Sequence, residues 1–92
     1  MPAAGRPDLH ILARFLDRMA QPGVGPFTKS KLQRAVGLNY DLFRKYLAVL
    51  LERGWVTALG KDARETFVLS EDGRRIRKEL AAWLATLFDG RL

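Results

Sequence analysis

Hydroxyl and lysine side chains alternate at the start of a short amphipathic segment, in the order Thr28-Lys29-Ser30-Lys31. Thr28 is a favourable helix N-cap. The unpaired N–H groups of a first helical turn and the positive end of the helix dipole bind anions. Two hydroxyls and two ammonium groups would support that contact, so the segment predicts phosphate binding. An N-cap followed by solvated lysines would have the same sequence, so this alternative stays open.

A second polar group begins with Asn39, Tyr40 and Asp41 and continues with Arg44 and Lys45. Asn39 is a favoured N-cap, and the carboxylate of Asp41 suits the positive end of a helix dipole. Arg44 and Lys45 can donate hydrogen bonds to guanine edges or to phosphates. The group predicts contact with nucleic acid, and the alternative is a solvated basic pair on an exposed helix.

A third basic pair, Lys61 and Arg64, lies in a polar turn between two β-prone stretches. A turn of this kind can place its cations on phosphates. Asp62 and Glu65 weaken that interpretation, because they cancel the positive charge. DNA contact and a simple soluble turn remain equal alternatives here.

Residues that could support catalysis are scarce. His10 is the only histidine, the chain has no cysteine, and no pair of carboxylates has a plausible opposing geometry. Gly23-Val24-Gly25 lacks the lysine of a phosphate-binding loop, and no strand precedes it. The sequence therefore predicts that the protein is no enzyme and uses no metal or cofactor.

Composition limits the protein to one small basic domain. The chain has 92 residues, 16 Lys and Arg against 10 Asp and Glu, a net charge of +6 and a pI near 10.3. No apolar run approaches the ~18–20 residues of a membrane span. The segment 1–7 has no hydrophobic region typical of a secretory signal, so we expect a cytoplasmic protein without membrane contact. The commonest acidic partner of such a domain is nucleic acid.

The excess of positive charge falls on residues 1–38, which contain six Lys and Arg residues and only two acidic residues, Asp8 and Asp17. This distribution favours binding to a phosphate backbone, with modest sequence specificity. The cations are Arg6, Arg14, Arg18, Lys29, Lys31 and Arg34.

The spacing of apolar residues and the positions of capping, Pro and Gly residues predict the helices and strands that carry these groups. After a flexible leader at 1–7, a helix capped by Asp8 runs to residue 20 or 21 and ends before Pro22-Gly23. Phe27 forms a very short strand, and helices follow from Thr28 to Gly37 and over 40–53. Strands at 55–59 and 65–69 enclose the polar turn. A last helix begins after Ser70 and ends near residue 88.

Three helices, a hairpin and a helix form an α+β, mostly α, winged-helix architecture. The winged helix-turn-helix domain, a three-helix core with a β-hairpin wing, spans 8–69, and a C-terminal helix over 70–90 is the expected dimerisation element. The apolar stripe of the third helix, Tyr40, Phe43, Leu47 and Leu50, faces inward. The outward face is then Asp41, Leu42, Lys45, Ala48 and Val49, with Arg44 at its border. Leu42 and Val49 are apolar for a groove-binding face, so a protein–protein module with weak or no DNA binding is the alternative function.

Four motifs resemble small archaeal winged helix-turn-helix proteins over residues 8–80. They are Thr28–Leu32 followed by Gly37–Tyr40, then Lys45-Tyr46-Leu47, Leu50–Val56 and Phe67–Arg74. The resemblance implies double-stranded DNA binding as a transcriptional regulator or a small basic chromatin protein. It assigns 40–53 as the recognition helix and the hairpin as the wing. Members of the family usually dimerise, some through a long C-terminal coiled coil, and the last helix here is short for that.

The last helix carries two apolar stripes, one of Ile76, Leu80, Trp83 and Leu87, the other of Ala81, Leu84 and Phe88. A domain this small can bury one of them, so the other is expected to form a homodimer interface, unless the first helix covers it. The interface residues are then Ile76, Leu80, Trp83, Leu84, Leu87 and Phe88. Basic residues of this helix, Arg74, Arg75, Arg77 and Lys78, are expected to pair with its own carboxylates.

Overall fold

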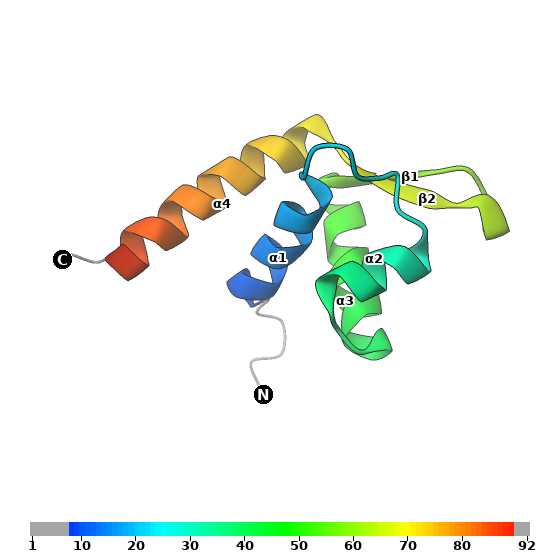
Figure 1. The fold of residues 1–92 in the computed structure, drawn as a ribbon, viewed down its shortest axis with the longest axis horizontal. Helices are drawn as coiled ribbons and strands as arrows, with labels where there is room; N and C mark the ends of the chain where they lie inside the picture. Colours follow the sequence, from blue (N-terminus) through cyan, green and yellow to red (C-terminus); the bar gives the residue numbers. More distant parts are fainter. Residues whose placement is uncertain (1–7, 90–92) are drawn as a thin grey trace.

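A computed structural model describes residues 8–89 of the chain, and the side chains of residues 8–86. Within them lie four α-helices and one antiparallel hairpin (Figure 1). The elements are α1 (Leu9–Met19), α2 (Lys29–Val36), α3 (Tyr40–Glu52), β1 (Val56–Leu59), the 3-10 turn η1 (Asp62–Arg64), β2 (Thr66–Leu69) and α4 (Glu71–Asp89). The predicted mostly helical winged-helix order is confirmed. The predicted leader, 1–7, lies outside the described residues, as does residue 90.

Local capping fixes where the first three helices begin. The side chain of Asp8 accepts a hydrogen bond from the His10 N–H, Thr28 from that of Lys31, and Asn39 from that of Leu42. All three predicted N-caps are thus confirmed. Gly37 ends α2 with φ of 68°, a left-handed conformation that glycine adopts without strain.

The core lies where α1, α2 and α3 meet beneath the hairpin. Its largest side chains are Phe15, Phe43 and Phe67, all with 2% or less of their surface exposed, and the rings of Phe15 and Phe43 stack at 5.7 Å. The other buried residues are Leu12, Leu16, Met19, Leu32, Val36, Tyr46, Leu47, Leu50, Val56 and Leu69. The apolar spacing therefore identified most of the core.

The inward stripe of α3 is rotated from the predicted one. Tyr46 is buried together with Phe43, Leu47 and Leu50, whereas Tyr40, predicted to face inward, has 49% of its surface exposed. Because residues on a helix are spaced by about 100°, burying Tyr46 turns the opposite edge of the stripe, where Tyr40 lies, into solvent. The prediction of an inward Tyr40 was wrong.

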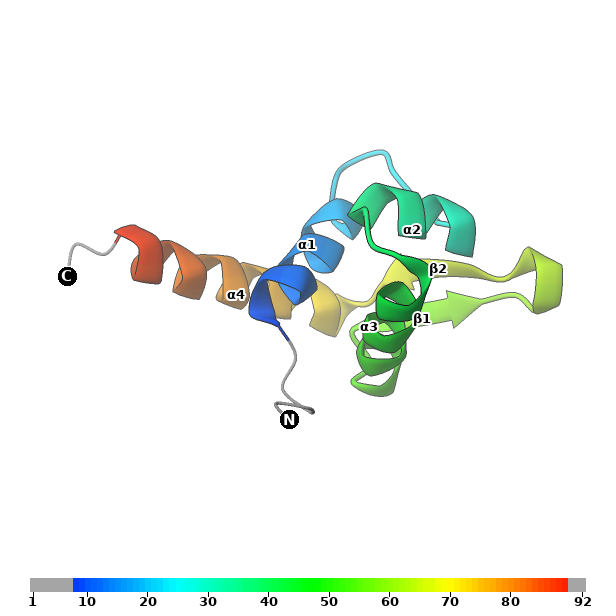
Figure 2. The same ribbon diagram turned by 90° about the horizontal axis from the view of Figure 1, so that it is seen from below.

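The hairpin pairs Val56 with Leu69 and Leu59 with Thr66, and its tip projects away from the helices (Figures 1 and 2). Phe27 adds one bridge to the sheet: its N–H and C=O exchange hydrogen bonds with Phe67 at 3.0 and 2.8 Å. The predicted very short strand at Phe27 is therefore a single isolated bridge.

The start of α4 is fastened to the end of α3 and the start of the hairpin. The hydroxyl of Ser70 donates to the Gly54 carbonyl at 2.6 Å and accepts from the Gly73 N–H at 3.0 Å, which confirms Ser70 as the cap. Gly73 lies so close to Trp55 that a Cβ there would be 2.1 Å from the Trp55 carbonyl oxygen. This close approach requires glycine.

Beyond this junction α4 packs across α1, and its C-terminal end extends past the body on the side away from the wing (Figures 1 and 2). An ion pair of 3.1 Å joins Arg77 of α4 to Asp17 of α1. No helix in the described part of the chain is both long enough and apolar enough to cross a membrane.

Candidate nucleic-acid interface

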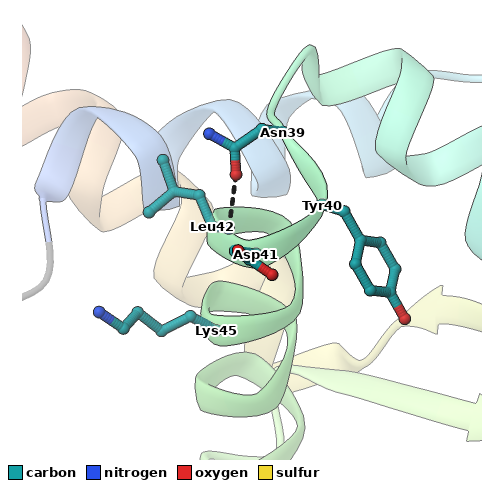
Figure 3. A pocket seen from close by; sticks show the side chains of 5 residues that line it. All are labelled: Asn39, Tyr40, Asp41, Leu42 and Lys45. Atoms are coloured by element: carbon teal, nitrogen blue, oxygen red, sulfur yellow. Dashed lines mark hydrogen bonds between the residues drawn. The ribbon is translucent and has the colours of Figure 1, made fainter.

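The first turns of α3 present charged and aromatic side chains to solvent. Tyr40 and Lys45 extend from opposite sides of the helix, with Asp41 between them (Figure 3). With Asn39 and Leu42 they line an open depression of about 470 Å³. The carboxamide oxygen of Asn39 caps the helix, so this predicted DNA contact also has a structural role.

Arg44 is held by an aromatic neighbour. Its guanidinium carbon lies 5.7 Å from the centre of the exposed Tyr40 ring, within the range of a cation–π interaction. The described residues provide no carboxylate within ion-pair distance of Arg44 or Lys45. Both predicted contacts are therefore exposed cations, and no ion pair within residues 8–86 neutralises their charge.

The two apolar residues predicted on the outward face of α3 are partly withdrawn from it. Leu42 is half-buried and packs against the core, and Val49 is also half-buried. The rotation of the buried stripe toward Tyr46 explains the burial of Leu42, which lies beside Tyr46 on the helix. The exposed face of α3 is thus more polar than predicted, and the apolar surface on which the protein–protein alternative was based is smaller than predicted.

The start of α2 keeps its predicted cations exposed. Lys29, Ser30 and Lys31 are all exposed, and neither lysine has an ion pair among the described residues. The hydroxyl of Thr28 is occupied by the Lys31 N–H at 3.2 Å. Thr28 therefore shapes the helix start, while the two lysines and Ser30 stay accessible to a ligand.

Two arginines of α1 are among the cations expected to bind a phosphate backbone, but they have a different role in the structure. Arg14 donates to the Val36 carbonyl at 2.9 Å, and Arg18 donates to the Ala35 carbonyl at 3.1 Å. These carbonyls belong to the last turn of α2, where no helical N–H is available to them. Arg14 and Arg18 therefore stabilise the C-terminal end of α2. Arg6 lies outside the described residues. In this half of the chain, the described cations that make neither a side-chain hydrogen bond nor an ion pair with other described residues are Lys29, Lys31 and Arg34 of α2.

The wing tip carries both signs of charge. Lys61 and Arg64 are exposed in the turn, together with Asp62, and Glu65 is half-buried. The short 3-10 turn is closed by the Arg64 N–H, which donates to the Lys61 carbonyl at 2.9 Å. The tip places two cations at the end of a projecting hairpin, but its local charge is balanced, as predicted.

The described residues contain no group of three or more His, Cys, Asp and Glu side chains that could hold a metal ion. The imidazole of His10 lies 3.7 Å from the carboxylate of Asp8 at the start of α1.

Comparison with known proteins agrees with this geometry. A sequence model of the winged helix-turn-helix family matches residues 6–86. The chain belongs to the winged helix-turn-helix family. The crystal structure of Sso10a-2, a DNA-binding protein from Sulfolobus solfataricus, has the same fold, with a TM-score of 0.74 at 21% sequence identity. The match covers 91% of this chain and 84% of that one. No curated protein matched the sequence.

In this winged helix-turn-helix fold, α2 and α3 form the helix-turn-helix, α3 stands in the place of the recognition helix, and β1 and β2 form the wing. The family and the fold are typical of non-enzymatic proteins.

Two basic residues of α4, Arg75 and Arg77, are engaged within the protein, whereas the described residues provide no ion pair for Arg74 or Lys78. Arg75 pairs with Glu79 at 3.1 Å and with Asp72 at 3.5 Å, and the hydrogen bond to Glu79 contributes most to raising the pKa of this guanidinium. The prediction of intrahelical pairs is confirmed for Arg75. Arg77 instead reaches Asp17 of α1, a long-range contact that sequence spacing cannot show.

The predicted dimer residues divide into three groups. Ile76 and Leu80 are half-buried against the core of their own chain, because α1 covers this part of α4. Trp83 is 52% exposed, and Leu84 is half-buried. The side chains of Leu87 and Phe88 lie outside the described residues. The first helix thus covers the N-terminal part of the stripe, and among the described side chains of α4 Trp83 remains as the large exposed apolar one.

Proposed function

We propose that the protein binds double-stranded DNA, with α3 in the major groove, as a transcriptional regulator or a nucleoid-type protein. The observation that carries the proposal is the exposed face of α3, where Arg44 and Lys45 have no ion pair within the described residues. A major groove about 12 Å wide admits one α-helix. The description of Sso10a-2 as a DNA-binding protein supports this function.

The start of α2 supports a second contact, with the phosphate backbone. In helix-turn-helix proteins the first helix of the pair crosses the backbone while the second enters the groove. Lys29, Ser30 and Lys31 stand exposed at that helix start, where N–H groups and the helix dipole favour an anion. Thr28 keeps this end of the helix in place.

The wing makes a weaker contribution in this proposal. Lys61 and Arg64 contact phosphates beside the groove that α3 occupies, while Asp62 and Glu65 limit the attraction. Binding therefore depends more on α2 and α3 than on the wing.

A homodimer formed through the free end of α4 completes the proposal. The end of α4 extends past the body of the protomer (Figure 1). Trp83, on the same helix, is exposed. Two-fold symmetry would present two copies of α3 to half-sites about 34–36 Å apart. The site of action that this function implies is the cytoplasmic nucleoid.

The test is a titration of a fluorescently labelled random duplex with the protein, followed by anisotropy at several salt concentrations. Binding is expected to weaken steeply, with a slope of about −0.9 per neutralised phosphate. Arg44→Ala and Lys45→Ala should each make the slope of log affinity against log salt concentration shallower by about 0.9, because each variant loses one cation that neutralises a phosphate. Arg75→Ala is the matched control, since Arg75 is paired with Glu79 and Asp72 on α4.

Absence of duplex binding even at low salt would overturn the proposal. Equal effects of Arg44→Ala and Arg75→Ala would contradict the assignment of α3 to the groove.

A further inference from the structure

The charges on the exposed face of α3 are arranged in three parallel lines. The centre of the face, opposite buried Phe43 and Leu50, is formed by Asp41, Ala48 and Glu52, which follow one another at spacings of seven and four residues. Arg44 lies on one side of this line and Lys45 on the other. Two carboxylates therefore stand in the middle of the face, with a cation on each flank.

This arrangement matches the electrostatics of a major groove. The phosphates line the two rims of the groove, and the base edges form its floor. Cations on the flanks of the helix are near the rims, where they neutralise phosphate. A carboxylate on the central line is as far from both rims as the helix allows, and it points toward the bases. Ala48 is small enough to let the helix approach the floor closely.

Asp41 is the central carboxylate placed to reach a base. It lies in the first turn of α3, and N-terminal residues of a recognition helix contact base edges. No described cation forms an ion pair with it, and Arg44 is held over the Tyr40 ring instead (Figure 3 shows Asp41 and Tyr40). Its carboxylate thus remains available as a pure hydrogen-bond acceptor.

The bases differ sharply as partners for such an acceptor. Cytosine presents only the N4 amino donor in the major groove, and guanine and thymine present acceptor oxygens that repel a carboxylate. Adenine has an N6 donor, but its N7 acceptor lies beside it. We infer that Asp41 is a specificity-determining residue, which selects cytosine by accepting a hydrogen bond from the N4 amino group of that base. This inference rests on the DNA-binding function proposed above.

The experiment is selection of bound duplexes from a pool with a randomised central segment, sequenced for the wild type and three variants. The wild type is expected to enrich cytosine at one position of each half-site, by about 5- to 10-fold over the other bases for one such contact. Asp41→Ala loses this enrichment. Asp41→Asn shifts it to adenine, because a carboxamide both accepts from N6 and donates to N7.

Glu52→Ala is the matched control. It removes the same charge from the same line of α3, but in the last turn, away from the base-contacting end. Both alanine variants should bind the random pool more tightly than the wild type, since each removes repulsion from phosphate. Only Asp41→Ala should lose the cytosine preference. Far-UV circular dichroism of each variant establishes that the helices are intact.

A direct chemical probe needs no variant. Replacing the enriched cytosine by N4-methylcytosine removes the N4 hydrogen that faces the major groove, and this should reduce wild-type binding by the same 5- to 10-fold.

Unchanged enrichment in Asp41→Ala, or full binding to the methylated duplex, would overturn this inference and leave DNA binding intact. Failure of the wild type to retain any duplex of the pool would overturn the proposed function itself.

Discussion

Gly73→Ala gives a sharp test of how α4 is attached to the winged helix-turn-helix core. Gly73 is in the first turn of α4, where alanine would ordinarily strengthen a helix by about 1 kcal/mol relative to glycine. The tertiary structure opposes that gain. A Cβ at this position would lie 2.1 Å from the Trp55 carbonyl oxygen and 2.7 Å from the Leu69 side chain.

The expected loss of stability in Gly73→Ala follows from the shift that the start of α4 must make. Backbone oxygen cannot rotate aside, so the start of α4 has to shift by about 1 Å away from β1 to restore an ordinary contact. That shift stretches the Ser70 N–H bond to the Trp55 carbonyl, 3.0 Å long, and the 2.6 Å bond from the Ser70 hydroxyl to Gly54. Losing two hydrogen bonds and the cap costs about 3 kcal/mol, which leaves a net destabilisation of about 2 kcal/mol.

The destabilisation by Gly73→Ala is measured as a change in Tm, from thermal unfolding monitored by circular dichroism at one fixed protein concentration. For a domain of this size about 2 kcal/mol corresponds to a fall in Tm of roughly 8–16 °C. Ser70→Ala is the companion variant, because it removes the cap and the hydroxyl's bond to Gly54 without the steric overlap, and its Tm should fall by a similar amount. A Gly73→Ala protein as stable as the wild type, or more stable, would refute the reasoning, since helix propensity alone would then decide the outcome.

Two further predictions concern parts of the molecule whose predicted and observed roles differ. Arg14→Ala should lower stability by about 1–2 kcal/mol, because it removes a partly buried charged donor from the last turn of α2. The slope of DNA affinity against salt should stay unchanged; a lower slope with intact stability would instead place Arg14 on phosphate. Trp83→Glu should convert a dimer to a monomer in size-exclusion chromatography with light scattering, since a charge cannot be buried unpaired in an apolar interface. A wild-type protein that is monomeric at all concentrations, or a variant that stays dimeric, would contradict dimerisation through α4.

Local chemistry made much of the fold predictable. Asp8, Thr28, Asn39 and Ser70 each satisfy an N–H two or three residues away, so short-range sequence is sufficient to place the helix starts. Gly37 ends α2 for a similarly local reason. The order of elements, the hairpin and most of the core follow from these signals together with apolar spacing.

The candidate interface was predictable in its residue types but not in its orientation. Tyr40 and Tyr46 are both amphipathic aromatics on α3, and spacing alone does not decide which of them is buried. Tyr46 is buried in the core, and its hydroxyl also accepts the Asp8 N–H at 2.7 Å. This choice turns Tyr40 outward and Leu42 inward, and it sets Asp41 at the centre of the exposed face.

The sequence by itself therefore determined the elements, their caps and the net charge, because these depend on neighbours along the chain. Only the tertiary structure decided how the charges are used. Arg14 and Arg18 donate hydrogen bonds to carbonyls at the end of α2, and Arg77 forms an ion pair with Asp17. The packing of the helices brings these partners together although they are far apart in the sequence. The cations that remain exposed on α2 and α3 are those without such a partner, and they define the candidate DNA-binding surface.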